Sequence, residues 1–358
     1  MRLQRALVAL AGPMLALAGA VPALAAPSPA STACPALTNP QWNAYDGSPA
    51  QATACGLTTY PLSSETTLPD GGTQWSYATP GNPIIANYPP TGFDPVTATP
   101  AEQSLYGIPA EPPATDPAAQ AQWLSALDHI KSWVKPSSFL VANPTVSNSI
   151  YSDNWSGYMD VESSGYFHYA WEEFIQPYDN SSHCTYRDET TWSGIGGDGN
   201  NDLGQDGTFI GNVKGLNEYQ AWVEALDLEP MVAVNMYATP GQYFEANTNY
   251  VNGQYNWYME NYYTGVVGTF SQADSNFSGA TTEFIAEDPL NLTADLANFG
   301  TLQFVWVASA VQESPVSAYP YDEIVMTTNG QSSGGVKAQP TALNSSGNAF
   351  NDGQESCD

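Results

Sequence analysis

Two glutamates lie four residues apart in the segment TTEFIAEDPL, which spans Thr281 to Leu290. The segment is typical of a β-strand, and on a strand Glu283 and Glu287 share one face with Ile285. A carboxylate can take a proton from an attacking water molecule and later return it to a leaving group. The chain holds 36 acidic residues, so most of them take no part in chemistry. Periodicity alone does not say which of the two glutamates is the better candidate.

Other hydrolytic chemistries have little support in the sequence. There is no His-Glu-x-x-His motif and the three histidines are scattered, so neither a metal nor another cofactor is expected. One Gly-x-Ser-x-Gly match, Gly330 to Gly334, precedes a segment without helical periodicity and is interpreted as a polar loop. Asp206-Gly207-Thr208 reverses the residue order of an aspartic peptidase loop. Carboxylate chemistry, assisted by side-chain amides, is the option that remains.

The elements that must position such groups are mostly strands. From about residue 147 the chain alternates short aromatic and β-branched segments with clusters of Gly, Asn, Asp and Ser. The clearest segments are NWSGYMDV, YFHYAWEEFI, TTWSGIGG, NEYQAWVEAL, MVAVNMYA, QYNWYMENYY, GVVGTFSQ, TTEFIAED, GTLQFVWVASA and EIVMTT. Many short strands separated by turn signals predict an all-β fold, an antiparallel β-sandwich or barrel.

The region before these strands has a different character. Residues 26 to about 103 are rich in Pro, Thr, Ala, Ser and Gly without a strong period, which indicates a pro-region or a loosely folded lead. One amphipathic helix is predicted over about 117–134, with Asp116 as its N-cap. Its apolar face consists of Trp123, Leu127, Ile130 and Val134.

The N-terminus has the form of a secretory signal. A basic start is followed by an apolar run and by the small-x-small sequence Ala23-Leu24-Ala25. Gly and Pro interrupt the run, which disfavours a membrane anchor, and no later segment approaches about 18 apolar residues. We therefore expect a signal peptide (1–25), a pro-region or N-terminal extension (26–145) and a catalytic β-sandwich domain (146–358), with no membrane contact after signal removal.

The charge balance points to an acidic medium. The chain has 7 Lys and Arg against 36 Asp and Glu, and its formal net charge is -29. Unbalanced negative charges repel one another at neutral pH, whereas at about pH 3 most carboxylates are protonated. The scarcity of basic residues argues against nucleic acid as a partner. We expect a secreted monomer that works outside the cell in acid.

Four cysteines, Cys34, Cys55, Cys184 and Cys357, suggest two disulfides with three possible pairings. Cys34–Cys55 is the most local choice. Cys184–Cys357 would then connect the C-terminus to the main domain.

Six segments carry a more specific signal. In chain order they are NWSGY (154–158), AWEEFIQP (170–177), WSGIGGDG with LGQDG, EYQAWVEAL (218–226), TEFIAEDP and LANFGTLQF. In this order they resemble motifs of the glutamic endopeptidases (eqolisins), in particular their bacterial secreted relatives. YGIPAEPPATDPAAQAQW also resembles a preamble found in bacterial members. The resemblance covers about residues 104 to 310, and six motifs in the right order are more specific than any one of them.

The resemblance implies a fold and a catalytic pair. The fold would be a concanavalin-like β-sandwich of two bent, mostly seven-stranded antiparallel sheets. The Gln-x-Gly match places the catalytic glutamine at Gln205, and the Glu-Phe-Ile match places the catalytic glutamate at Glu283. Glu287 falls in a second acidic position of the same motif. A Glu-activated water would attack the peptide bond, and the amide of the glutamine would stabilise the oxyanion at any pH in this range. A histidine base would be protonated in acid.

The resemblance also assigns the cleft. Trp192 and Glu224 match residues that line it, and Asp198 is the acidic residue retained beside Gly196, where fungal members carry an Asp. The implied activity is that of a secreted, acid-acting endopeptidase with protein or peptide substrates and no cofactor or metal.

Two other readings use the same architecture. A carbohydrate-binding or glycoside-hydrolysing β-sandwich would use Glu224 and Glu283 as its paired carboxylates. A secreted binding domain would use neither. Gln205 separates the readings, because a glycosidase has no need of it.

Overall fold

The computed structural model describes residues 58–108, 111–112, 114–115, 117–136, 138–141, 151–180, 187–198, 201–211, 218–289, 295–309 and 314–357. Within these residues the regular structure is nearly all β-strand, as the sequence predicts. The helical elements among them are α2 (Pro100–Leu105), α3 (Pro117–His129) and the 3-10 turn η2 (Val316–Ala318).

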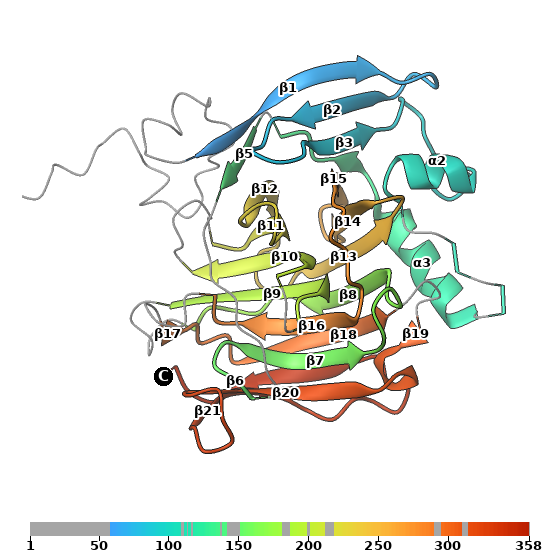
Figure 1. The fold of residues 1–358 in the computed structure, drawn as a ribbon. Helices are drawn as coiled ribbons and strands as arrows, with labels where there is room; N and C mark the ends of the chain where they lie inside the picture. The colour runs from blue at the N-terminus through green and yellow to red at the C-terminus, as the bar shows by residue number, and fades with distance from the viewer. Residues whose placement is uncertain are drawn as a thin grey trace, which may run out of the picture. The chain divides into compact units, whose positions relative to one another are not determined.

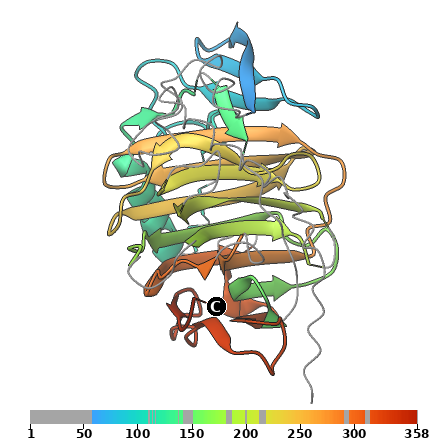
Figure 2. The same cartoon turned by 90° about the vertical axis from the view of Figure 1, so that its left-hand side faces the viewer.

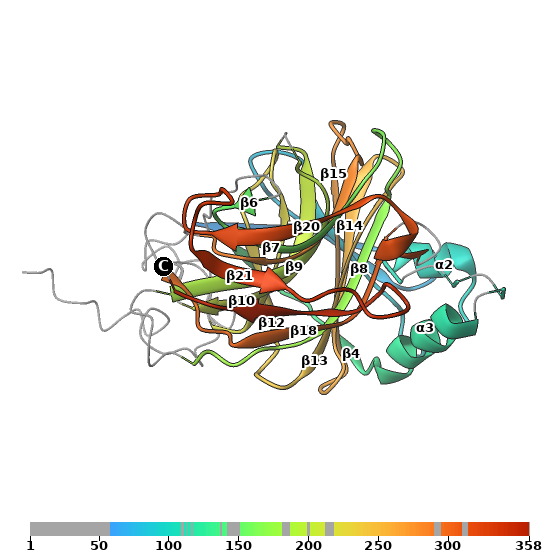
Figure 3. The ribbon, with the colours of Figure 1, turned by 90° about the horizontal axis from the view of Figure 1, so that it is seen from below.

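The strands form two antiparallel layers, seen edge-on in Figure 3. Sheet A contains, in spatial order, β5 (Ser138–Val141), β12 (Val232–Tyr237), β11 (Gln220–Ala225), β10 (Leu203–Gly211), β9 (Arg187–Gly196), β16 (Thr281–Glu287) and β7 (Trp155–Val161). Sheet B contains β2 (Thr73–Tyr77), β3 (Ile84–Tyr88), β15 (Val266–Ala273), β14 (Gln254–Asn261), β13 (Tyr243–Val251), β8 (Tyr169–Ile175), β18 (Thr301–Ser309), β22 (Phe350–Gln354) and β21 (Val336–Pro340).

Two strands join the sheets at opposite ends, where Figures 1 and 2 show the blue and the red strands. β1 (Thr59–Thr67) pairs with β5 and then with β2, and β20 (Tyr321–Thr327) pairs with β7 and then with β21. The short strands β4 (Ser132–Trp133), β6 (Tyr151–Ser152), β17 (Asp295–Leu296) and β19 (Ser314–Pro315) pair with β15, β20, β9 and β18. The β-sandwich predicted from the sequence is therefore confirmed.

Apolar side chains fill three layers. Phe284, Phe244 and Phe174 belong to the main core between the sheets. A second cluster covers the outer face of sheet A, and it includes Trp155, Trp192, Trp222 and Ile285. A third cluster covers the outer face of sheet B, where Trp123 and Leu127 of α3 join Trp171 and Tyr258. Alternation along each strand sends neighbouring residues to opposite faces, so both faces of both sheets are packed.

The N-terminal extension is more structured than the sequence predicts. Instead of a loosely folded lead, the chain from Thr59 to Tyr88 forms three strands that continue both sheets. Aromatic residues from it, among them Tyr77 and Phe139, enter the main core. Composition hid these strands because their turns are rich in Pro and Gly. The division of the chain at residue 145 remains a proposal.

The predicted helix forms but ends earlier. α3 begins at Pro117 and stops at His129, because the amides of Lys131 and Ser132 donate to the carbonyl of Gly265 at 2.7 and 3.0 Å. The N-cap prediction at Asp116 lies outside the described residues. Sequence analysis missed α2, although Thr99 and Glu102 form a capping box at its start.

The C-terminus lies beside the start of β9. Leu296 of β17 donates its amide to the carbonyl of Cys357 at 3.0 Å, and β17 pairs in parallel with Arg187 and Asp188. Cys357 is not a free thiol. Cys34, Cys55 and Cys184 lie outside the described residues, so both pairings remain predictions. No helix in the described part of the chain is both long and apolar enough to cross a membrane.

Candidate active site

Strand register brings the two candidate catalytic residues to the same glycine. Gln205 of β10 lies directly opposite Gly194 of β9, and Glu283 of β16 lies opposite the same Gly194 from the other side. Directly opposed residues point to the same face of a sheet. Gln205 and Glu283 therefore flank a position that has no side chain, on the outer face of sheet A.

The strand that carries Gln205 is one that sequence analysis did not assign. LGQDGTFIG is not among the segments predicted as strands, whereas Leu203–Gly211 is a regular strand paired on both sides. Its three glycines lower the strand propensity of the segment. Pairing between β9 and β11 overrides that preference.

Glu224 holds the amide of Gln205. The two residues are register partners on β11 and β10, and Gln205 Nε2 donates to Glu224 Oε2 at 2.5 Å. An amide nitrogen carries two hydrogens, so this bond leaves the second N–H for another acceptor. Gln205 Oε1 has no hydrogen-bond partner among the described residues. The amide is thus fixed in place with unused hydrogen-bonding capacity.

Glu283 is fully buried, with 0% of its surface exposed. Neither of its carboxylate oxygens meets a hydrogen-bond partner in the described part of the chain. Burial raises the pKa of Glu283 well above its ordinary value, the nearby hydroxyl of Thr281 opposes the rise, and the charge of Asp198 adds to it. An unsatisfied buried carboxyl is costly, which makes this residue a candidate for function.

Glu224, the register partner of Gln205, behaves in a similar way. Burial raises the pKa of Glu224 to about 8, and the hydrogen bond from Gln205 opposes the rise. In an acidic medium Glu224 therefore carries its proton. Its carboxyl can position Gln205 without placing a negative charge beside it.

Trp192 lies at the floor of the gap. It precedes Gly194 by two residues on the same face, and a Cβ atom built on Gly194 would lie 3.0 Å from Trp192 Cζ3. The indole is buried and packs edge-to-face against Trp155, with ring centroids 5.1 Å apart. Its benzo edge thus lies between the strands that carry Gln205 and Glu283.

Asp198 lies beyond the end of β9 and is exposed. Its negative charge raises the pKa of Glu283. The neighbouring Gly196 has φ +90°, and a Cβ there would come within 2.0 Å of the carbonyl oxygen of Asp202. No carboxylate side chain fits at that position. Asp202, which sequence analysis missed, accepts a hydrogen bond from the Tyr255 hydroxyl at 2.8 Å, and its charge also raises the pKa of Glu283.

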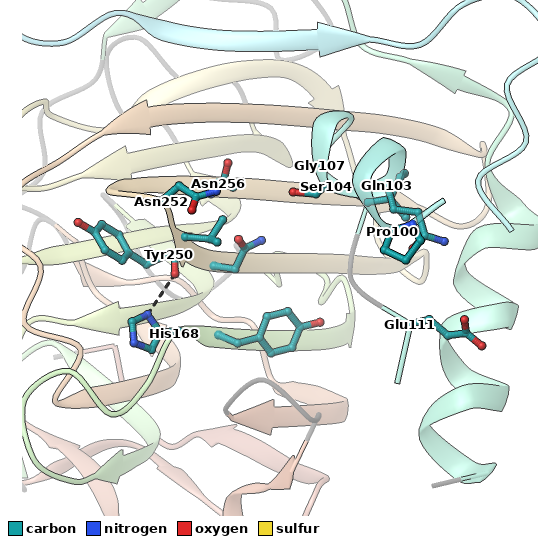
Figure 4. A pocket seen from close by; sticks show the side chains of 13 residues that line it. Pro100, Gln103, Ser104, Gly107, Glu111, His168, Tyr250, Asn252 and Asn256 are labelled. Carbon is teal, nitrogen blue, oxygen red and sulfur yellow. Dashed lines mark hydrogen bonds between the residues drawn. The ribbon is translucent and has the colours of Figure 1, made fainter. Parts of the chain in front are cut away.

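A separate cavity lies against sheet B. Its volume is about 620 Å³, and Figure 4 shows Ser104 and Gln103 of α2 on one side and Tyr250, Asn252 and Asn256 on the other. None of its lining residues lies on a strand of sheet A. Among the described residues no group of three acidic, His or Cys side chains is arranged to hold a metal ion.

The protein is thus an antiparallel β-sandwich with a buried Glu and Gln on one face of sheet A, and the comparisons with known proteins give its class. The family model described as the Peptidase A4 family matches residues 153–347, more than half of the chain. The chain therefore belongs to this family of peptidases, and the resemblance to the glutamic endopeptidases is confirmed.

Solved structures of two glutamic peptidases are similar to the chain. Two structures of scytalido-glutamic peptidase with transition state analogues have TM-scores of 0.45 and 0.43 and identities of 16% and 18%, and each covers 57% of this chain and 98% of the other. Aspergilloglutamic peptidase from Aspergillus niger has a TM-score of 0.38 and 20% identity, over 47% of this chain and 99% of the other. No curated protein matches the sequence.

Proposed function

We propose that this peptidase is a secreted, acid-acting endopeptidase in which Glu283 activates water and Gln205 stabilises the oxyanion. The observation that carries the proposal is the common register partner of the two residues, Gly194. Their α-carbons are two strand spacings apart, about 10 Å. Gly194 between them has no side chain of its own, and Leu203 Cδ1 and Trp192 Cζ3 pack over that position. Trp192, Glu224 and Asp198 act in this proposal as the residues around the substrate.

The division of labour follows from the two side chains. Glu283, when ionised, takes a proton from water as the water attacks the carbonyl carbon, and returns it to the leaving amine. The second N–H of Gln205 donates to the oxyanion, and an amide keeps this ability at every acidic pH. The bond from Gln205 to Glu224 supports this role, because a preorganised donor needs no reorientation during the reaction.

The full-length chain has a buried dyad. Gln205 is 1% exposed and Glu283 is 0% exposed, so substrate reaches them only after part of the chain moves. While buried, Glu283 keeps its proton in acid because its pKa is raised. We propose that opening lets water reach the carboxyl, which returns its pKa towards about 4.3 and allows it to ionise.

The burial of Gln205 and Glu283 in the full-length chain supports the interpretation that this chain is a zymogen. We propose that residues 26–145 include a segment that is cleaved on maturation. The strands that the chain from Thr59 to Val141 adds to both sheets restrict where such a cut can fall without opening the core. N-terminal sequencing of acid-treated protein checks this, and a mature N-terminus upstream of Tyr60 would count against removal of the whole region.

The glycosidase reading is disfavoured by the same register. Glu224 and Glu283 are separated by three strand spacings, about 14 Å between α-carbons. The Glu224 carboxyl accepts a hydrogen bond from the Gln205 amide between them, and a glycosidase has no need of that glutamine. The signal-like residues 1–25 support secretion, and the net charge of -29 supports action in acid as a monomer.

The test is digestion of an unfolded protein across pH 2 to 7 by the acid-treated wild type and by Glu283→Gln, with an aspartic peptidase inhibitor present. We expect cleavage at acid pH by the wild type that resists the inhibitor, and none by the folded variant. Equal activity of the two proteins would overturn the proposal.

A further inference from the structure

We infer that Glu287, the second glutamate of the TTEFIAE strand, is a positioning residue that fixes the Trp192 indole beside the gap between Gln205 and Glu283. The inference rests on the proposed function, because it concerns the same site. It assigns different tasks to two glutamates that lie four residues apart on one face of β16.

Both carboxylate oxygens of Glu287 are occupied. Trp192 Nε1 donates to Glu287 Oε2 at 2.8 Å, and Asn154 Nδ2 donates to Glu287 Oε1 at 3.0 Å. All three side chains are buried. In Glu283, by contrast, neither oxygen has a partner among the described residues. Each oxygen of Glu287 is therefore engaged by a buried side-chain donor, and these contacts are those of a positioning residue.

The Asn154 amide is itself held in one orientation. Ser152 Oγ donates to Asn154 Oδ1 at 2.8 Å, so the amide nitrogen is the end that faces Glu287. The backbone amide of Asp288 donates to the carbonyl of Asn154 at 2.7 Å and fastens this turn to the end of β16. The first residue of the NWSGY motif, Asn154, therefore donates a hydrogen bond that orients the Glu287 carboxylate.

The Trp192 ring transmits this support to the dyad. Its nitrogen end is bonded to Glu287, one flank packs edge-to-face on Trp155 at 75°, and Cζ3 of its other edge lies beside Gly194. A ring fixed at these places has one available orientation. Loss of the bond at its nitrogen end would let the benzo edge tilt into the gap or away from it, where the scissile peptide must lie. Displacement of about 1 Å at such a place can lower a rate about 10²-fold.

The decisive experiment exchanges the two partners. Glu287→Gln replaces one carboxylate oxygen with an NH₂ group. That group faces either Asn154 Nδ2 or Trp192 Nε1, and neither nitrogen can accept a hydrogen bond from it, so one of the two bonds is lost. The double variant Asn154→Asp with Glu287→Gln restores the complement, because the new amide can donate to the new carboxylate and still accept from Trp192. We expect Glu287→Gln to lower kcat by about 10-fold and Glu287→Leu by about 10²-fold. The double variant should recover most of the loss in Glu287→Gln.

A second readout is independent of activity. The indole N–H resonance of Trp192, assigned by its absence in Trp192→Phe, should move in Glu287→Gln and return in the double variant. Glu189→Gln is the matched control, since Glu189 is a buried glutamate of sheet A whose carboxyl bonds to Thr191. It should leave the resonance and kcat unchanged.

Two results would overturn the inference. One is wild-type kcat in folded Glu287→Leu, and the other is a loss in Glu287→Gln that the double variant does not recover. The proposed function fails separately, if Glu283→Gln cleaves as fast as the wild type in the same assay.

Discussion

The two sheets each carry a row of buried acidic side chains on the outer face, and the rows are built differently. The sheet-A row is Glu224, Gln205, Gly194 and Glu283, on four neighbouring strands. The sheet-B row is Glu173, Glu245 and Glu260, which are direct register partners on β8, β13 and β14. Burial is nearly complete in both rows.

Tyrosine hydroxyls donate hydrogen bonds to the carboxyl groups of the sheet-B row. The Tyr262 hydroxyl shares its one hydrogen between Glu245 Oε2 at 2.7 Å and Glu173 Oε1 at 3.1 Å, and Tyr258 donates to Glu260 Oε2 at 2.7 Å. Tyr243 also donates to Glu173. Each glutamate of this row therefore accepts at least one hydroxyl, and the row links the strands to one another.

The sheet-A row has a glycine and an amide where the sheet-B row has a continuous line of acids. Perturbed acidity does not distinguish the rows, because burial raises the pKa of Glu224 and of Glu260 to about 8 in the same way. The difference is that Glu283 lacks a partner among the described residues and lies beside a position with no side chain. Unused hydrogen-bonding capacity beside a gap is the better sign of catalysis.

The sharpest test of this comparison is the same substitution in both rows. Glu283→Gln should lower kcat/KM at acid pH by about 10² to 10⁴, the usual contribution of a general acid or base. Glu245→Gln removes a carboxylate of equal burial and should leave kcat/KM within about twofold of the wild type, since it touches no reacting atom. Steady-state kinetics on one peptide substrate at three acidic pH values measures both. Equal losses would show that the rows do not differ in kind.

The amide of the sheet-A row gives the next largest effect. Gln205→Ala should lower kcat by about 10² to 10³, the loss typical of one oxyanion donor, with little change in KM. Gln220→Ala is the matched control: this buried glutamine of β11 donates to the carbonyl of Val234 at 3.0 Å and lies away from Gly194. If the control loses as much kcat as Gln205→Ala, the amide at 205 has no special role.

The sequence predicts the two rows unequally. The family motifs predict Gln205 and Glu283 as the pair, and the hydrophobic pattern predicts β16, which carries Glu283, and the two neighbours of the Gln205 strand, β9 and β11. The meeting of Gln205 and Glu283 at Gly194 is a matter of register, which long-range pairing decides and a single sequence does not display. The β10 strand stayed hidden because its glycines mask it, although it carries the catalytic glutamine of the proposal.

The sheet-B row left almost no trace in the sequence analysis. Tyr243 and Glu245, like Tyr258 and Glu260, are two residues apart and so share a strand face, but this spacing does not say which strands pair with each other. Asn154 and Glu287 were seen only as parts of motifs. Their contacts with Trp192 depend on side-chain packing, which no spacing rule states.

Stability against pH probes both rows together. Burial raises the folded-state pKa of Glu260 to about 8, and the Tyr258 hydroxyl opposes the rise. In the unfolded chain its pKa returns to about 4.3, so between these values only the folded protein keeps the proton. Stability is then full below about pH 4 and falls as pH rises to 8, by roughly 1.4 kcal/mol per pH unit for such a group. Urea unfolding of the wild type from pH 4 to 8 should show a fall at least this steep, because Glu224 and Glu260 both contribute to it.

Substitution of these glutamates by glutamine shows which of them cause the fall in stability with pH. Glu260→Gln and Glu224→Gln should each flatten the curve by a similar amount, since the pKa is raised to about 8 in both. A wild-type curve that rises with pH over this interval would contradict the assignment of these groups as buried and protonated.

The smallest expected effect comes from one hydroxyl of the sheet-B row. Tyr262→Phe keeps a ring that can stack on His129, and the two ring centroids are 4.9 Å apart in the wild type. The substitution removes the hydroxyl that Glu245 and Glu173 share. Leaving buried acceptors unsatisfied should lower the free energy of unfolding by about 1 to 3 kcal/mol, with kcat unchanged. Tyr263→Phe is the neighbouring control, because Tyr263 is 76% exposed and should change neither quantity. Urea unfolding at pH 4 gives the stability. A fall in kcat with Tyr262→Phe, at wild-type stability, would mean that the sheet-B row serves the reaction and that satisfied hydrogen bonding is not what separates the two rows.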